Sequence, residues 1–305
     1  MFLTVLEQVA ILFILIGIGY LLGKGKIIAE TGAKQMTDIC LLIVTPCVVI
    51  KSFLRPFSTQ ILKAVLTSFL LAFFTQVFFI LCSRFLFRDR KEASRRVLQF
   101  GIVFSNCGFM SLPLQEQVLG EEGLLYGASF VAIFNLLVWS YGILHISGDP
   151  SFFRPKKLIL NPGIIGLVIG FSLFVFSIPL PSFVQTPIVS LAALNTPLPM
   201  LIIGYHLANS DIVKSAKDSA CLLSVLWRLI IFPLLALFGM YCCQVRGNLL
   251  VSTIISCSAP TAAITTMFAS RFQKDVELSV SMVSLSTLVS LFTMPLLVTL
   301  AKYLA

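Results

Sequence analysis

The sequence predicts an all-α protein that crosses a membrane several times, and two observations support this fold class. Of the 305 residues, 58% are hydrophobic and only 11% are charged, whereas about 25% of the residues in a typical soluble domain are charged. The apolar residues also fall into runs of roughly 20 residues, the length of a helix that spans a bilayer. Ten such runs with short connections predict ten transmembrane helices.

The ten runs can be located in order along the chain. The first run, residues 5–22, is longer than the apolar core of a secretory signal and has no clear small-residue cleavage site, so we expect it to be a retained span. The predicted spans are 4–22, 36–54, 61–85, 97–119, 124–146, 158–178, 183–208, 219–243, 249–270 and 276–303.

The fourth span is interrupted by polar and helix-breaking residues at mid-depth. Residues 105–113 include Ser105, Asn106, Gly108 and Pro113. Glycine weakens a helix and proline removes a backbone donor. Lipid tolerates such a break only where the freed polar groups face protein or a water-filled cavity.

The ninth span has a similar interruption, with Ser256, Ser258, Pro260 and Thr261 inside an apolar run. Two interrupted hydrophobic segments at corresponding positions of two halves are a pointer to the binding site of a secondary transporter. We therefore expect these two spans to meet as broken helices near the middle of the membrane.

A constant offset indicates a duplicated unit. Thr196-Pro197 follow Thr45-Pro46 by 151 positions, and Ser256 follows Ser105 by the same number. This offset predicts two five-span repeats, residues 1–150 and 151–305, within one transporter domain. Five is an odd number, so the second repeat enters the membrane from the opposite side and the repeats are inverted.

The distribution of basic residues predicts the orientation. Sixteen of the 22 Lys and Arg residues lie in the loops that follow odd-numbered spans. Cytoplasmic loops carry the excess of Lys and Arg, so this side is assigned to the cytoplasm and both termini to the outside. The same placement explains the net charge of +9 by topology and lipid headgroups rather than by nucleic acid.

The chain lacks the patterns of a metal or redox site. Its eight cysteines are scattered without metal-ligand spacing, and its two histidines, His145 and His206, are far apart. We expect no metal, no cofactor and no catalytic residues.

Several segments resemble the auxin efflux carrier family, which includes the plant PIN proteins and bacterial relatives. The similarity involves Lys157–Pro162 at the start of the sixth span, Ser105–Leu114 with Gly120, Ala259–Ala269, and Gly19-Tyr20. It extends over nearly the whole chain. In two respects the chain departs from the plant carriers: Ser105 replaces a proline, and the connection Ser147–Lys157 is short.

The resemblance implies ten helices with a crossing of the fourth and ninth, elevator-type transport of organic anions, and a homodimer. The short central loop is that of a compact bacterial member. Such members are often labelled malate or malonate permeases, so auxin itself is not expected as the substrate.

The candidate substrate-binding residues lie at the two interruptions and in the fifth span. Asn106 offers a directed amide beside a half-helix N-terminus that can hold a carboxylate, although it could simply cap the broken backbone. Asn135 could line the cavity or join two helices. The predicted binding residues are Asn106, Ser105, Asn135, Ser256, Ser258, Pro260 and Thr261, and the predicted helix-breaking residues are Gly108, Pro113 and Pro260.

Two charged residues fall within predicted spans. Arg228 in the eighth span could attract an anion, form an ion pair, or extend to the cytoplasmic face. Asp38 in the second span could pair with a cation or carry a proton.

The sequence therefore predicts a secondary transporter of a small organic anion in a cell membrane. Spans 3–5 and 8–10 would move against a scaffold of spans 1, 2, 6 and 7. A sodium- or proton-coupled symporter is the main alternative, because unwound carbonyls can coordinate a cation. An intramembrane enzyme or a channel is a remote alternative, because the chain lacks paired buried carboxylates and a metal cluster.

Overall fold

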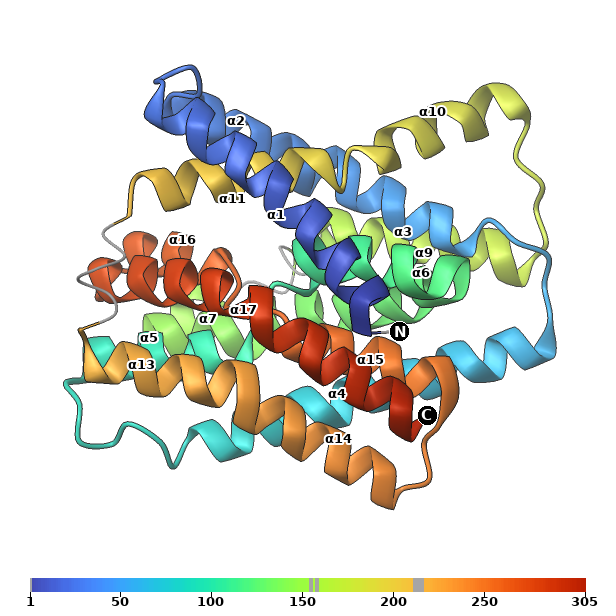
Figure 1. Cartoon of the computed structure of the whole chain (residues 1–305). Coiled ribbons are helices and arrows are strands. Elements are labelled where there is room, and N and C mark those ends of the chain that lie inside the picture. The colour runs from blue at the N-terminus through green and yellow to red at the C-terminus, as the bar shows by residue number, and fades with distance from the viewer. Residues whose placement is uncertain (1, 154–155, 157–158, 211–216) are drawn as a thin grey trace.

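The fold is all-helical, as the composition predicts. A computed structural model of the chain describes residues 2–153, 156, 159–210 and 217–305, and within these residues every extended regular element is a helix (Figure 1). Among the described residues, seven helical segments are long and apolar enough to cross a membrane. The predicted start of the sixth span at Leu158 lies outside the described residues, as do Arg154, Lys157 and Lys214 of the basic loops.

The first half of the chain begins with two long apolar helical segments and includes three short π-helical turns and one 3-10 turn. Its elements are α1 (Phe2–Lys24), α2 (Glu30–Ile39), η1 (Cys40–Val44), α3 (Thr45–Phe53), α4 (Thr59–Ser83), α5 (Glu92–Val103), η2 (Cys107–Ser111), α6 (Leu112–Leu137), η3 (Val138–Gly142), α7 (Ile143–Ser147) and η4 (Pro150–Phe152).

The second half follows a similar order of long, interrupted and kinked segments. Its elements are α9 (Pro162–Val175), α10 (Ser182–Ala193), α11 (Pro197–Ala208), α13 (Ser219–Leu226), η5 (Trp227–Ile231), α14 (Phe232–Cys242), α15 (Gly247–Ser258), α16 (Ile264–Arg271) and α17 (Val276–Leu304).

Gly120 divides the longest apolar segment. The stretch Cys107–Ser147 is helical over 41 residues, but Gly120 has a φ of +66° and a non-helical backbone. Only glycine adopts this conformation at little cost. The predicted boundary between the fourth and fifth spans, around residues 119–124, therefore falls at this kink.

The non-helical break in the fourth span lies upstream of Gly108 and Pro113, the residues predicted to cause it. The non-helical residues are Phe104, Ser105 and Asn106, whereas Gly108 lies in the π-turn η2 and Pro113 in the first turn of α6. A π-turn also precedes Pro46 and Pro233. The wider turn accommodates a residue that lacks an N–H group, so these prolines occur without ending the helix.

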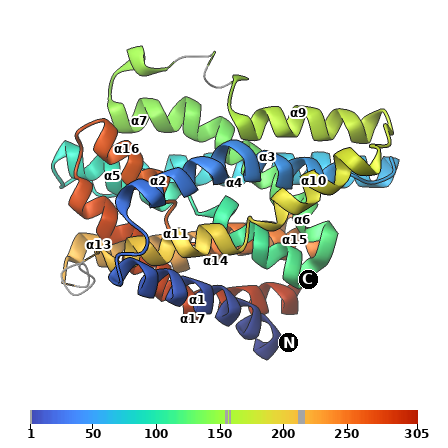
Figure 2. The ribbon, with the colours of Figure 1, turned by 90° about the horizontal axis from the view of Figure 1, so that it is seen from above.

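Four helical segments pack together through close backbone contacts. Helix α1 packs against α11, and α3 packs against α9 (Figure 2). A Cβ atom on Gly19 would lie 2.4 Å from the carbonyl oxygen of Leu201, and one on Gly170 would lie 3.0 Å from the Cα atom of Ile50. Small residues permit this separation, as is common between membrane helices.

The remaining helices surround the two interruptions and contain most of the large aromatic core. The rings of Phe79 in α4 and Phe232 in α14 stack with centroids 4.4 Å apart. Phe100 contacts Phe104 and Phe268, which joins the first interrupted segment to the second. This core fixes the positions of the helix ends that meet at the interruptions.

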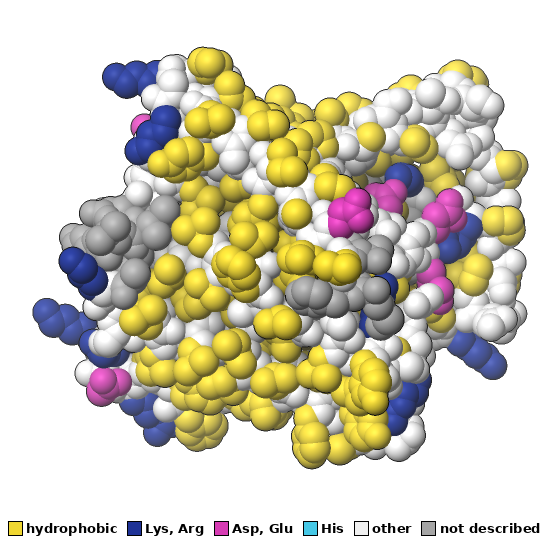
Figure 3. Space-filling view, in the orientation of Figure 1, with side chains coloured by type: hydrophobic (Ala, Val, Ile, Leu, Met, Phe, Trp, Pro, Cys, Tyr) yellow, Lys and Arg dark blue, Asp and Glu magenta, His cyan; other side chains and the backbone are white. Residues whose placement is uncertain are grey.

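The surface has the pattern of a multi-pass membrane protein. Large apolar side chains are exposed along the long helices, for example Leu70, Phe74 and Phe78 on α4. In Figure 3, hydrophobic side chains cover the middle of the visible face and charged side chains lie toward its two ends. The N- and C-termini lie in the same half of the molecule (Figure 1), and the Gly247 N–H donates to the carbonyl oxygen of Ala305.

Candidate functional site

The two predicted interruptions meet through their backbones. The Asn106 N–H donates to the Pro260 carbonyl at 2.7 Å, and the Ala262 N–H donates to the Phe104 carbonyl at 3.0 Å. Ser105 and Thr261 form an isolated antiparallel bridge between these two bonds. Pro260, predicted to break the ninth span, lies in the non-helical stretch between α15 and α16. We call residues 104–106 and 259–263 the crossover.

Two helix C-termini end at the crossover, and Arg228 joins them. The guanidinium Nη1 donates to the carbonyl oxygens of Ile102 at 2.7 Å and Val103 at 3.0 Å, at the end of α5. Nη2 donates to the carbonyl oxygen of Cys257 in the last turn of α15. Arg228 has no exposed surface. A helix C-terminus carries about half a negative charge, so one guanidinium balances two such ends.

The ion pair predicted as one possibility for Arg228 has no counterpart in the described part of the chain. The ion pairs there involve other residues, and no Asp or Glu is buried. The acceptors of Arg228 are backbone carbonyls, and its ring neighbour is Phe79, with the guanidinium carbon 5.8 Å from the ring centroid.

The helix that follows the first interruption begins with free donors. Within the described residues, the backbone N–H groups of Gly108 and Phe109 have no acceptor, whereas the Cys107 N–H bonds to the Ser105 carbonyl. The Asn106 side chain, which is 6% exposed, makes no hydrogen bond to a described residue. A Cβ atom on Gly108 would meet no atom within 4 Å, so there is open space beside these donors.

Three of the four hydroxyl groups predicted as ligands, those of Ser256, Ser258 and Thr261, are engaged in internal bonds. Ser256 Oγ accepts from Gln115 Nε2 at 2.8 Å. Ser258 Oγ donates to the Ile255 carbonyl, and Thr261 Oγ1 donates to the Gly101 carbonyl, both at 3.2 Å. These side chains hold the crossover together and leave Asn106 as the candidate amide with unused hydrogen-bonding capacity.

Two buried amides that were not among the predicted site residues also lie here. Asn195 Nδ2 donates to the Gly108 carbonyl at 3.4 Å, and its Oδ1 atom is buried without a partner. Gln115 Nε2 bonds to the Ser252 carbonyl as well as to Ser256, and its Oε1 atom is likewise unpartnered. The sequence signal for each residue was an uncharged amide within an apolar segment. The sequence could not show that the fold places these two amides beside the crossover.

Two other predicted residues lie away from the crossover contacts. Asn135 Nδ2 donates to the Val131 carbonyl at 2.9 Å and lies beside Gly163 at the start of α9. Asp38 is exposed on α2, and no ion pair of Asp38 occurs among the described residues.

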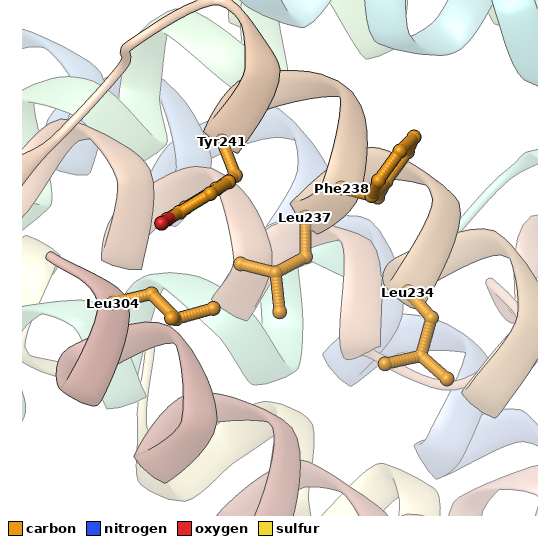
Figure 4. A pocket seen from close by; sticks show the side chains of 5 residues that line it. All are labelled: Leu234, Leu237, Phe238, Tyr241 and Leu304. Carbon is orange, nitrogen blue, oxygen red and sulfur yellow. The ribbon is translucent and has the colours of Figure 1, made fainter.

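Two surface hollows are distinct from the crossover. One of about 240 Å³ is apolar and is lined by Leu234, Leu237, Phe238, Tyr241 and Leu304 (Figure 4). The other, of about 410 Å³, is lined by Arg84, Arg88, Arg95 and Gln99. No group of His, Cys, Asp or Glu side chains that could hold a metal ion occurs in the described ranges of the chain.

Comparisons with known proteins agree with a transport function. The sequence profile of a family described as "Membrane transport protein" matches residues 4–298. An uncharacterized transporter of Methanothermobacter thermautotrophicus is 26% identical over 294 residues, which cover 95% of this chain and 96% of the relative. An uncharacterized transporter of Methanocaldococcus jannaschii is 24% identical over 307 aligned positions, covering 95% and 97%.

The match over nearly the whole length confirms the resemblance that the sequence motifs indicated. The apolar helices, the interrupted segments and the family match together identify a multi-pass membrane protein of transport function. The chain belongs to the membrane transport protein family that includes the auxin efflux carriers.

Proposed function

We propose that this protein carries a small organic anion across a cell membrane by an elevator-like alternating-access mechanism. The observation that carries the proposal is a difference in hydrogen bonding between the helix C-termini and the helix N-termini at the crossover. The C-terminal ends of α5 and α15 are bonded to Arg228, whereas the N–H groups of Gly108 and Phe109, next to Asn106 in the chain, have no acceptor in the described part of the structure.

The electrostatics of these ends favour an anion. Each helix N-terminus carries about half a positive charge, and its free N–H groups can donate to a carboxylate. The second interruption adds to this partial positive charge, because the N–H groups of Ala263 and Ile264, at the start of α16, also have no acceptor among the described residues. A carboxylate held by such groups would gain charge-assisted hydrogen bonds.

The buried charges also favour an anion over a cation. Among the described residues, Arg228 is the one buried charged side chain, and no Asp or Glu is buried. Buried Asp and Glu residues mark the ion pathways of many cation carriers, and none occurs among the described residues of this chain. The proposed substrate class is therefore a carboxylate.

Equivalent contacts support an inverted repeat and a separate scaffold. Gly170 follows Gly19 by 151 positions, and Leu201 follows Ile50 by the same number, so the contacts Gly19–Leu201 and Gly170–Ile50 correspond. In the proposed mechanism, α1, α2–α3, α9 and α10–α11 form the scaffold. The crossover and its surrounding helices move against this scaffold and carry the substrate with them.

Charge movement in liposomes tests the proposal. The purified protein would be reconstituted and exposed to a panel of mono- and dicarboxylates, with and without sodium and at two pH values. We expect saturable currents that carry negative charge inward with the substrate. Uptake of labelled carboxylates would be measured in parallel, because electroneutral exchange produces no current. Neither current nor uptake for any carboxylate would contradict the proposed substrate class.

A further inference from the structure

Arg228 is buried in surroundings that resemble the binding site of a metal cation. Three backbone carbonyl oxygens, those of Ile102, Val103 and Cys257, accept hydrogen bonds from its guanidinium. They belong to the C-terminal ends of two different half-helices. In secondary transporters, half-helix C-terminal ends and unwound carbonyls coordinate a coupling cation such as sodium.

The shape of a guanidinium suits this position. Its Nη1 atom bonds to the end of α5, and its Nη2 atom bonds to the end of α15, so a rigid planar fork connects the two helices. A lysine ammonium is a compact point charge on a flexible stem and cannot reproduce this fixed spacing.

The charge balance leaves no need for a second cation. Two helix C-termini together carry about one negative charge, which one guanidinium neutralises. No buried carboxylate among the described residues adds to that negative charge. A metal ion bound at the same carbonyls would meet the charge of Arg228 in a medium of low dielectric constant, where repulsion is strong.

We propose that Arg228 is the built-in cation of the crossover and occupies the place that a bound metal cation would otherwise take. It is a positioning residue, because it fixes the two half-helix ends and through them the crossover. Its removal leaves a carbonyl-lined site that accepts a small monovalent cation. The conclusion about coupling ions rests on the proposed transport function. The stability measurements below do not depend on that function.

The test compares the thermal unfolding midpoints of purified full-length variants in sodium chloride and in choline chloride of equal ionic strength. The variants are Arg228→Ala, which vacates the site, and Arg228→Lys, which retains a charge. The control is Arg246→Ala, because Arg246 also donates to carbonyls near a helix C-terminus, those of Tyr241 and Val245, but is only partly buried. Guanidinium chloride at low millimolar concentration, far below denaturing levels, serves as a probe for the vacated site.

We expect the wild-type midpoint to be the same in sodium and in choline. Arg228→Ala should lower the midpoint by roughly 10 °C, and guanidinium or sodium should restore part of this loss with a saturable dependence on concentration. Arg228→Lys should have an intermediate midpoint without such restoration, and Arg246→Ala should resemble the wild type.

Two results would overturn the proposal. One is a wild-type midpoint that rises saturably with sodium, because a metal cation would then bind in addition to Arg228. The other is an Arg228→Ala protein with a wild-type midpoint. If Arg228→Ala does not fold, the comparison of wild type with Arg228→Lys decides the question. These measurements use no substrate, so failure of the carboxylate assays would leave their outcome unaffected.

Discussion

Asn106 and Gln115 are two buried amides near the crossover, and their surroundings give them different roles. Gln115 is fully buried and donates to Ser252 and Ser256, so it joins α6 to α15. Asn106 is the N-cap residue of η2, retains a small exposed surface and has no side-chain partner among the described residues. An unbonded polar side chain at mid-membrane depth is costly unless a ligand or water completes its bonds. We therefore expect Asn106 to bind substrate and Gln115 to hold the site together.

Replacement of Asn106 tests this difference. Asn106→Ala should weaken carboxylate binding about 10- to 100-fold, because a hydrogen bond to a charged group contributes about 1.5–3 kcal/mol. The thermal unfolding midpoint should remain near that of the wild type, since no hydrogen bond of the side chain to the described residues is lost. Binding would be measured by titration of the purified protein with the carboxylate identified in the transport assay.

Asn209→Ala is a matched control for this experiment, because Asn209 is an exposed asparagine that bonds to the Tyr205 carbonyl at the end of α11. Its affinity for the carboxylate should be unchanged. Unaltered affinity of Asn106→Ala, with the protein folded, would remove Asn106 from the binding site.

At the scale of elements, the interfaces of α1 with α11 and of α3 with α9 depend on glycines that allow two backbones to approach. Gly19 faces the backbone of Leu201, and Gly204 faces the backbone of Ile16. No sequence pattern distinguishes these glycines from Gly17, which lies on the same helix with open space around it. The distinction arises only when the second helix is in place.

A glycine-to-alanine pair within α1 tests the close contact. Gly19→Ala should lower the unfolding midpoint, because its Cβ atom would lie 2.4 Å from the Leu201 carbonyl oxygen and the helices would have to separate. Gly17→Ala should have no effect or a slightly stabilising one, since alanine is the better helix former by about 1 kcal/mol.

Gly170→Ala extends the same experiment to the corresponding contact of the second half. Its Cβ atom would lie 3.0 Å from the Ile50 Cα atom, so we expect a smaller loss than for Gly19→Ala. Equal midpoints for Gly19→Ala and Gly17→Ala would argue against the packing of α1 on α11 described here. The melting curves would be measured on detergent-solubilised protein by intrinsic fluorescence.

At the scale of the whole molecule, the placement of basic residues predicts which end faces the cytoplasm. The loop between α4 and α5 carries Arg84, Arg88 and Arg90, whereas the exposed cysteines Cys242 and Cys243 lie at the C-terminal end of α14. The charge pattern assigns the end of α14 to the outside. These two cysteines are therefore native sites for a thiol reagent on that face.

Thiol labelling in intact cells tests this orientation. A membrane-impermeant maleimide should react with Cys242 and Cys243 from outside. In a Cys242→Ser, Cys243→Ser background, Arg90→Cys should react only after the cells are permeabilised. The reverse pattern would place both termini in the cytoplasm and invert the predicted topology.

The sequence by itself determined the membrane class, the family, and the positions of the two interrupted segments. These features depend on local quantities: the length of apolar runs, the lack of charge, and prolines or polar residues at mid-span. Asn106 and Pro260 could be identified in this way because each interrupts an apolar run at the point where the backbone departs from the helix.

Only the tertiary structure decided which polar groups at the crossover are already bonded and which are free. Ser256, Ser258 and Thr261 looked as suitable for binding as Asn106, yet their hydroxyls have internal partners. Arg228 lies about 125 positions from one set of its acceptors and 29 from the other, so no local pattern could reveal them. Hydrogen bonds between distant segments depend on how the helices pack, and a single sequence read by periodicity and composition does not contain that information.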